Sequence, residues 1–236
     1  MSAEKSLRVA VIGARGRLGS AAVEVLRASP EFELVLELGS ADDVPAALRR
    51  GRPEVALDVT RAGLGFEHGK LLLEHGVRPV IGTSGVSLDE NGALDALARE
   101  RGLGGLVVPN FSLGMWLLQK AAVEAARYFE QVEILEMHHE KKRDAPSGTS
   151  LDTAERMRAA RASPGAPIPI HSVRLPGLYA HQVVVCGSAG EVYSLRHDMS
   201  GPQAFGPGIQ AAVRYASRAT GVGRGIGIAF EAARPG

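Results

Sequence analysis

Residues 7–19 read LRVAVIGARGRLG, an apolar and β-branched run followed at once by three glycines in GxxGxxG spacing. Apolar residues then recur at helical spacing as far as Ser29. The pattern predicts a strand, a glycine turn and a helix. In such a turn the first glycine permits a sharp bend, the second lets main chain approach a diphosphate, and the third allows close helix–strand packing. We therefore expect a dinucleotide site here, in preference to a plain strand–helix turn.

Further apolar runs alternate with helical patterns up to residue 108. We expect strands at 32–38, 55–59, 77–81 and 106–108, and helices at 66–75 and 89–101. This alternation is typical of a parallel sheet, in which ligands bind beyond the carboxyl ends of the strands. The residues that follow the strands, 60–61, 82–85 and 109–112, are therefore candidates for a cofactor site. Ordinary turn chemistry predicts a similar composition there.

The end of the second expected strand should lie beside the adenosine ribose of a bound dinucleotide. An acidic residue at that point bonds the ribose 2′-hydroxyl and repels a 2′-phosphate. Glu37 either faces the ribose or points elsewhere, and Gly39 follows shortly after. Arg15 and Arg17 could each meet a 2′-phosphate. Both NADH and NADPH remain open as cofactors.

The second half of the chain contains its densest group of polar residues, VEILEMHHEKKRDAPSGT at 132–149. An expected strand brings His138 and His139 into a loop with Lys141 and Lys142, ahead of an expected helix start at 147–150. Histidine titrates near neutrality, and a lysine among other cations is a better acid. The free N–H groups of a helix start suit an anion. The loop therefore fits an anionic substrate that must also receive a proton, although a solvated charged turn is the simpler alternative.

The elements around this loop predict a second unit. A long helix at 113–128 precedes it, and a helix at 150–162 follows it. Strands at 132–138, 168–175, 179–186 and 191–197 predict a mixed or antiparallel sheet of about four strands. A helix at 209–220 and a last strand at 226–230 then return to the first half of the chain.

Composition excludes several classes of function. The 236 residues carry a net charge of +1, which provides no overall field for nucleic acid or an anionic membrane. No apolar run is long enough to span a bilayer, and Cys186 is the single cysteine, so a cytoplasmic, reducing location is expected. His138 and His139 are adjacent without further ligands at metal-binding spacing, and we expect no metal site.

The motif from Glu136 to Thr149, EMHHEKKRDAPSGT, resembles the E-x-H-H-x-x-K-x-D-A-P-S-G-T motif of the 4-hydroxy-tetrahydrodipicolinate (dihydrodipicolinate) reductase family. GARGRLG, DVT, GTSG, PNFS and VRLPGLYAHQ are similar to its other landmarks, in the same order. The resemblance implies a Rossmann-like parallel-sheet dinucleotide domain plus a second α/β domain with an open mixed sheet, usually in a homotetramer. It also implies reduction of 4-hydroxy-tetrahydrodipicolinate to tetrahydrodipicolinate by NADH or NADPH, with loss of water, in lysine and diaminopimelate biosynthesis.

The resemblance also implies a role for individual residues. His138 is the expected proton donor and acceptor, Lys142 a proton donor, and His139, Gly148 and Thr149 bind the dicarboxylate substrate. The expected dinucleotide contacts are Gly13, Ala14, Arg15, Gly16, Arg17, Leu18, Gly82, Thr83, Ser84, Val108, Pro109, Asn110 and Phe111. The expected domains are a dinucleotide domain at 1–109, a substrate-binding and oligomerisation domain at 110–207, and a C-terminal return at 208–236.

Three positions depart from the family pattern. Gly39 stands in the acidic slot, Pro202 stands where an arginine is frequent, and the segment before Ile168 is short. They motivate two alternatives, a catalytically weak dinucleotide-binding paralogue and a reductase of a different cyclic imine acid. The intact His138, Lys142 and Gly148-Thr149 set favours the reductase.

Overall fold

A computed structural model describes residues 6–161 and 166–233, in two compact units. The first unit runs to Leu113 and resumes at Phe205, whereas the second comprises Gly114–Ala204. Part of the short segment before Ile168, residues 162–165, lies outside the described residues. The two units are described in turn.

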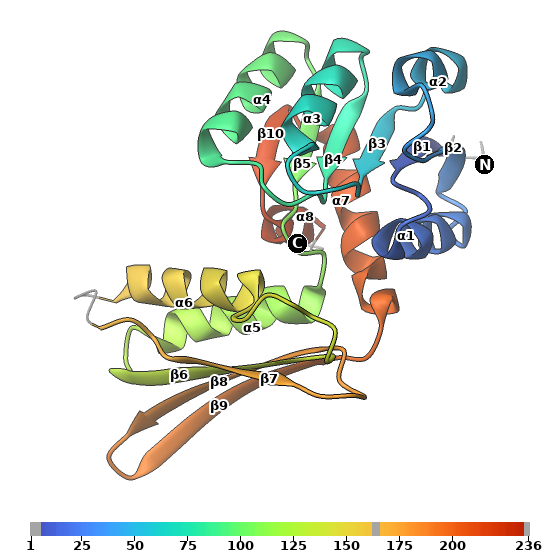
Figure 1. Ribbon diagram of the computed structural model, residues 1–236. Coiled ribbons are helices and arrows are strands. Elements are labelled where there is room, and N and C mark those ends of the chain that lie inside the picture. Colours follow the sequence, from blue (N-terminus) through green and yellow to red (C-terminus); the bar gives the residue numbers. More distant parts are fainter. Residues whose placement is uncertain (1–5, 162–165, 234–236) are drawn as a thin grey trace. The chain divides into compact units, whose positions relative to one another are not determined.

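The first unit is built on a six-stranded parallel sheet in the order β10-β5-β4-β3-β1-β2 (Figure 1). The register pairs Ile12 with Asp58, Asp58 with Ile81, and Ile81 with Val107. The carboxyl ends of four strands are therefore level, and their following turns emerge at one edge. The strands are β1 (Leu7–Ile12), β2 (Phe32–Leu38), β3 (Val55–Asp58), β4 (Arg78–Ile81), β5 (Gly104–Val107) and β10 (Gly221–Arg224).

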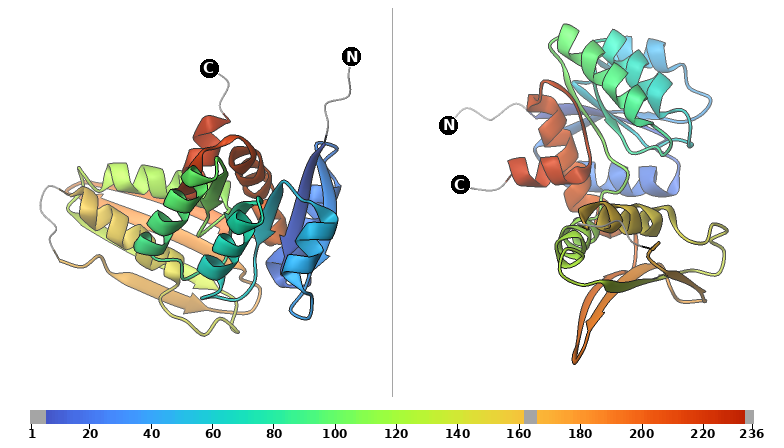
Figure 2. Two further views of the ribbon diagram at one scale, coloured as in Figure 1. Left: turned by 90° about the horizontal axis from the view of Figure 1, so that it is seen from above. Right: turned by 90° about the vertical axis from the view of Figure 1, so that its left-hand side faces the viewer.

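Helices cover both faces of this sheet, which makes a three-layer α/β unit (Figures 1 and 2). On one face, Leu48 and Leu72 pack on β1, β2 and β3, and Leu94 packs on β4, β5 and β10. On the other face α7 contacts α1 and the three central strands. The helices are α1 (Arg17–Arg27), α2 (Val44–Gly51), α3 (Gly65–Glu74), α4 (Leu88–Glu100), α7 (Gly206–Arg218) and α8 (Ile226–Ala232).

The two segments of the first unit touch where the chain leaves it and returns to it. A Cβ built on Gly208, near the start of α7, would lie 1.9 Å from the carbonyl oxygen of Phe111. Only glycine permits this approach of main chain to main chain. The expected return of the C-terminal segment to the dinucleotide half therefore occurs at α7.

The expected strand at 226–230 is wrong, because this segment forms the helix α8, and the last strand is β10, immediately before it. A short apolar run such as IGIAF has no periodicity that separates a strand from a helix. The sequence does not predict β10, because two of its four residues are glycines, which are uncommon in strands. A Cβ on Gly221, which has a φ of 84°, would meet the Asp95 carboxylate at 2.2 Å, so close packing excludes a larger side chain.

Helix α2 is a second element that the sequence patterns did not predict. Its start carries two recognisable signals, since the Asp43 side chain accepts a hydrogen bond from the N–H of Ala46 and Pro45 occupies the first turn. Its eight residues make little more than two turns, and Ala47 and Leu48 are its buried positions.

The second unit is a mixed four-stranded sheet in the order β7-β6-β8-β9, with two helices on one face (Figures 1 and 2). Leu118 and Met157 from the helices pack on Ile134, Val184 and Cys186 of the sheet. The predicted mixed sheet is confirmed. The elements are β6 (Gln131–His138), β7 (Ile170–Arg174), β8 (Ala180–Ser188), β9 (Glu191–Met199), α5 (Leu113–Ala125) and α6 (Gly148–Ala160), and the 3₁₀ helix Pro202–Phe205 follows.

Candidate active site

The glycine turn joins β1 to α1 in the geometry expected of a phosphate cradle. Gly13 has a φ of 88°, and its N–H and that of Ala14 both donate to the carbonyl of Leu38. Gly16 caps α1 without a side chain, so the first N–H groups of the helix face an open position. A Cβ on Gly19 would lie 2.0 Å from the carbonyl oxygen of Gly13, which explains the third glycine. The turn can therefore accept a diphosphate against main-chain N–H groups.

The tips of β3 and β4 are joined by hydrogen bonds at the carboxyl edge of the sheet. The N–H of Thr60 donates to Oγ1 of Thr83 at 3.1 Å, and that hydroxyl donates to the carbonyl of Asp58 at 3.3 Å. Thr83 is therefore buried and engaged with main chain. Gly82 and Ser84 flank it at the same tip. The tip offers main-chain groups to a ligand.

At the tip of β5, two of the expected cofactor residues have buried side chains. Val108 and Phe111 are 1% and 2% exposed, so their side chains belong to the core. A Cβ on Gly82 would lie 2.6 Å from the ring of Phe111, which brings these two tips together. Asn110 accepts a hydrogen bond from the N–H of Ser112 and shapes the loop that also contains Pro109. Only main-chain atoms of Val108 and Phe111 remain for a dinucleotide.

The carboxyl end of β2 carries both acidic and basic side chains. The Glu37 carboxylate is paired with Arg27. A Cβ built on Gly39 would lie 3.5 Å from Nη1 of Arg15, so this guanidinium lies over the glycine. Asp42 accepts a hydrogen bond from the N–H of Gly39 at 2.7 Å. Arg17, at the start of α1, is also exposed.

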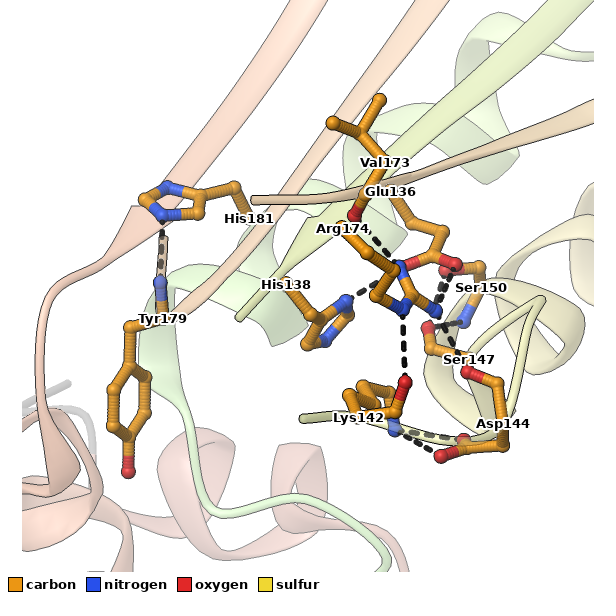
Figure 3. Close-up of polar contacts among 10 residues, drawn as sticks. All are labelled: Glu136, His138, Lys142, Asp144, Ser147, Ser150, Val173, Arg174, Tyr179 and His181. Atoms are coloured by element: carbon orange, nitrogen blue, oxygen red, sulfur yellow. Dashed lines mark hydrogen bonds and ion pairs between the residues drawn. The ribbon is translucent and has the colours of Figure 1, made fainter. Parts of the chain in front are cut away.

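Strand β6 ends at His138, whose ring is held by a buried acid two residues earlier. Nδ1 of His138 lies 2.5 Å from Oε2 of Glu136, which is fully buried (Figure 3). Burial on its own raises the pKa of Glu136. Hydrogen bonds from Arg174, Ser172 and His138 together lower this pKa by more than burial raises it, so the net pKa lies below its ordinary value and the carboxyl is ionised. An ionised carboxylate only accepts hydrogen bonds, so Nδ1 carries the proton and Nε2 is the other ring nitrogen available for chemistry.

The imidazole of His138 is neutral around pH 7. Burial lowers its pKa most, the hydrogen bond and charge of Glu136 raise it, and the charges of Lys142 and Arg174 lower it again, so the net pKa falls below the ordinary value. A neutral imidazole with a protonated Nδ1 is a base at Nε2.

Lys142 lies in the loop after β6. Its Nζ donates to both carboxylate oxygens of Asp144 at 2.7 Å (Figure 3). The Lys142 hydrogen bond lowers the pKa of Asp144, more than burial raises it. The sequence suggested that Lys142 is surrounded by cations, whereas its ammonium is paired with an anion that a substrate carboxylate could replace.

Helix α6 begins at Gly148 and Thr149, directly after this loop. Ser147 caps the helix, and its hydroxyl accepts the N–H of Ser150 at 3.2 Å. The N–H groups of Gly148 and Thr149 precede any intrahelical acceptor. A Cβ on Gly148 would have no neighbour within 4 Å, so this position is open to a ligand. His139, at the end of β6, is half-buried, and its carbonyl accepts the N–H of Lys142.

Two pairs of polar residues were missing from the sequence-based site. Arg174 pairs with Glu136 from the neighbouring strand, and buried Asp58 lies 3.3 Å from Nδ1 of His68 on α3. Glu136 is the first residue of the motif from Glu136 to Thr149, but nothing in the sequence indicates which cation pairs with it. Among the described residues, no group of three or more histidine, cysteine, aspartate or glutamate side chains could hold a metal ion.

The glycine turn on a parallel sheet and the histidine–lysine loop beside a helix start are each features expected of a nicotinamide-dependent oxidoreductase. The chain belongs to the dihydrodipicolinate reductase family. The model for the N-terminus of this family matches residues 7–111, and that for the C-terminus matches residues 114–225. The resemblance of the motif from Glu136 to Thr149 to this family is thereby confirmed.

Curated relatives and a solved structure agree with this assignment. The chain is 40% identical to 4-hydroxy-tetrahydrodipicolinate reductase of Bacillus velezensis, with 89% of this chain and 92% of the relative covered. It is 39% identical to the enzyme of Legionella pneumophila, with 93% and 97% covered. The dipicolinate-bound dihydrodipicolinate reductase from Paenisporosarcina sp. TG-14 is 34% identical, has a TM-score of 0.84, and is covered over 98% of its length and 94% of this chain.

Proposed function

We propose that this chain reduces 4-hydroxy-tetrahydrodipicolinate to tetrahydrodipicolinate with NADH or NADPH, and that His138 and Lys142 handle the protons. Membership of the family makes the chain an NAD(P)H-dependent reductase of lysine and diaminopimelate biosynthesis. The observation that supports the residue roles is the His138–Glu136 pair, which directs Nε2 of a neutral imidazole away from the buried acid.

The substrate is a dicarboxylate, and the second unit offers groups for both of its charges. The free N–H groups of Gly148 and Thr149 and the positive end of α6 suit one carboxylate. His139 and the Lys142 ammonium suit the other, at the cost of the Lys142–Asp144 pair. The solved relative was obtained with bound dipicolinate, which is itself a small dicarboxylate.

Proton chemistry divides between the two side chains. A bound dinucleotide would supply the hydride, and the conjugated imine that accepts it would be left with an electron pair on a ring carbon or nitrogen. Lys142, an ammonium with three protons, is the acid that quenches this charge. Nε2 of His138 accepts or returns a proton during the accompanying loss of water, and the carboxylate of Glu136 stabilises the imidazolium that forms.

The first unit fits the dinucleotide. Main-chain N–H groups of the turn from Gly13 to Leu18, which includes Ala14, Arg15, Gly16 and Arg17, would hold the diphosphate. Gly82, Thr83 and Ser84, with main-chain atoms of Val108, Pro109, Asn110 and Phe111, would meet the nicotinamide half. We assign dinucleotide binding to residues 1–109 with the return at 208–236, and substrate binding to residues 110–207.

The open face of the second sheet supports a homotetramer. Leu135, Met137, Val183 and Val185 alternate with buried residues, so they lie on the face opposite α5 and α6. They are half-buried in the single chain, and a second sheet would cover them. Light scattering should give four chains per particle.

In the described ranges no helix is long and apolar enough to cross a membrane. We place the enzyme in the cytoplasm.

A coupled assay tests the proposed reaction. Substrate formed freshly from pyruvate and aspartate semialdehyde should support oxidation of NADH or NADPH by the purified protein, followed by absorbance. Omission of the semialdehyde gives the background rate, and His138→Gln should lose most of kcat while it still binds dinucleotide. Protein that is folded by circular dichroism but turns over neither cofactor would contradict the proposed function.

A further inference from the structure

Glu136 is a fully buried carboxylate that accepts hydrogen bonds from Arg174, His138 and Ser172. Arg174, on β7, donates from Nη1 to Oε2 at 2.9 Å and from Nη2 to Oε1 at 2.8 Å. Nδ1 of His138 lies 2.5 Å from Oε2. Figure 3 shows the side chains of Arg174, on β7, and His138, on β6, converging on the Glu136 carboxylate. Oε2 is therefore shared between the arginine and the candidate catalytic histidine.

The same guanidinium also holds the loop that carries Lys142. Nε of Arg174 donates to the carbonyl of Lys142 at 3.3 Å, and Nη2 donates to the carbonyl of Asp144 at 2.7 Å. These carbonyls flank Arg143, at the centre of the loop after β6. One side chain thus connects the orientation of His138 with the main-chain position of Lys142.

Stability alone gives a weak reason for this arrangement. A buried ion pair loses much of its Coulomb energy to desolvation, and apolar residues of similar volume often serve as well. Apolar residues at both positions would, however, leave Nδ1 of His138 and two loop carbonyls without these partners. The arrangement is therefore better explained by what it does for the loop and the histidine.

We propose that Glu136 and Arg174 are positioning residues that hold His138 as its Nδ1–H tautomer, with Nε2 as the proton-transfer atom, and hold Lys142 in the same site. This inference rests on the proposed function for its kinetic consequence, but the tautomer can be measured without substrate. Neither residue was among those expected to form the site.

The charges around the imidazole determine the direction in which the His138 pKa should change when the Glu136 carboxylate is removed. Three charged groups act on His138, namely Glu136 from its own strand, Lys142 from the loop and Arg174 from β7. Glu136 is the one that raises the pKa of His138, against burial and the two cations, which lower it. Loss of the carboxylate should therefore lower the His138 pKa further and release the ring from the Nδ1–H form.

The test compares Glu136→Gln with Glu133→Gln. Glu133 lies on the same strand and also contacts a histidine, His171, at 2.8 Å, but this pair is exposed. Glu136→Gln should lower kcat by about 10- to 100-fold, as for other residues that orient a functional histidine, with dinucleotide affinity unchanged. Glu133→Gln should behave as wild type. Wild-type kcat in Glu136→Gln would overturn the proposal.

Nitrogen NMR of histidine-labelled protein provides the readout that a purely structural role would not change. The signals of the 7 histidines are assigned by single substitutions. Wild type should show His138 protonated at Nδ1, and Glu136→Gln should show a mixed tautomer and a lower pKa. A wild type protonated at Nε2 overturns the proposal, as does loss of kcat in Glu136→Gln with tautomer and pKa unchanged.

Two further measurements keep the test decisive. If Glu136→Gln does not fold, Arg174→Lys replaces it, because lysine keeps the positive charge but loses the two-pronged hydrogen bonding of the guanidinium. This variant should have a clearly lower kcat with little change in Tm. Wild-type kcat in Arg174→Lys would overturn the proposal that Arg174 holds the loop. Absence of turnover in wild type would contradict the proposed function, whereas the NMR signals of His138 would still decide the positioning role.

Discussion

Lys142→Met is the most direct test of the proposed acid. The substitution keeps the length and apolar stem of the side chain and removes the ammonium, which donates to both oxygens of Asp144 at 2.7 Å. General acid catalysis contributes about 10²- to 10⁴-fold in rate, which is about 3–5 kcal/mol of transition-state stabilisation. We therefore expect kcat to fall by that factor.

The cost to folding should be much smaller. The Asp144 side chain is 59% exposed, and exposed ion pairs contribute about 0–1 kcal/mol because solvent screens them. The expected change in the free energy of unfolding is therefore at most about 1 kcal/mol, well below the kinetic effect. A large loss of rate with little loss of stability is the signature of a chemical role.

The assay measures kcat with freshly formed substrate, the dinucleotide Kd by fluorescence, and unfolding by urea. Lys141→Met is the matched control, because Lys141 is exposed in the same loop and should keep wild-type kcat. Dinucleotide affinity should be unchanged in both variants, since the glycine turn belongs to the first unit. A loss of kcat below tenfold in Lys142→Met, or an equal loss in Lys141→Met, would refute this assignment of the acid.

Three other changes have definite expected outcomes. Gly19→Ala should abolish dinucleotide binding in titrations, because its Cβ would lie 2.0 Å from a main-chain oxygen of the turn, and normal binding would contradict the proposed phosphate cradle. Gly92→Ala is the control, since its Cβ would have no neighbour within 4 Å, and it should add about 0.5–1 kcal/mol to the unfolding free energy. Gly39→Asp should weaken NADPH relative to NADH, since a carboxylate repels a 2′-phosphate, and an unchanged ratio of Kd values would show that the phosphate lies elsewhere. The hydrogen bond to Asp58 raises the pKa of His68, although burial lowers it. The pair therefore stabilises the fold fully below the unfolded pKa of about 6.5, and this contribution is lost as the pH rises through the folded pKa. In urea titrations His68→Gln should cost more stability at pH 5.5 than at pH 9, and equal costs would exclude the charge effect.

The parts of the fold that were predictable have strong local signals. The run before Gly13 is β-branched, and the glycine spacing follows it directly, so strand, turn and helix could each be inferred from adjacent residues. The strand that ends at His138 was equally clear. In contrast, the segment after Ala219 places glycines in a strand and apolar residues in a short helix, which reverses the usual propensities. Packing against neighbouring elements decides such segments.

The site shows the same division between local and distant information. His138, Lys142 and the start of α6 are close in sequence, so a motif could bring them together. The Glu136–Arg174 pair joins residues 38 apart, and it depends on the parallel register that sets His138 opposite Arg174. The burial of Phe111 was equally hidden, because it depends on packing against Gly82, 29 residues away in the sequence.

The contact between Phe111 and Gly208 has an architectural consequence. The chain leaves the first unit just after Phe111 and resumes it just before Gly208, so the entire second unit is inserted between two points that already touch. In topological terms, the second unit is a long loop of the first unit. All six strands of the first sheet lie outside this insertion. Insertions, deletions and substitutions in the inserted unit can therefore accumulate while the strand order of the first sheet stays intact.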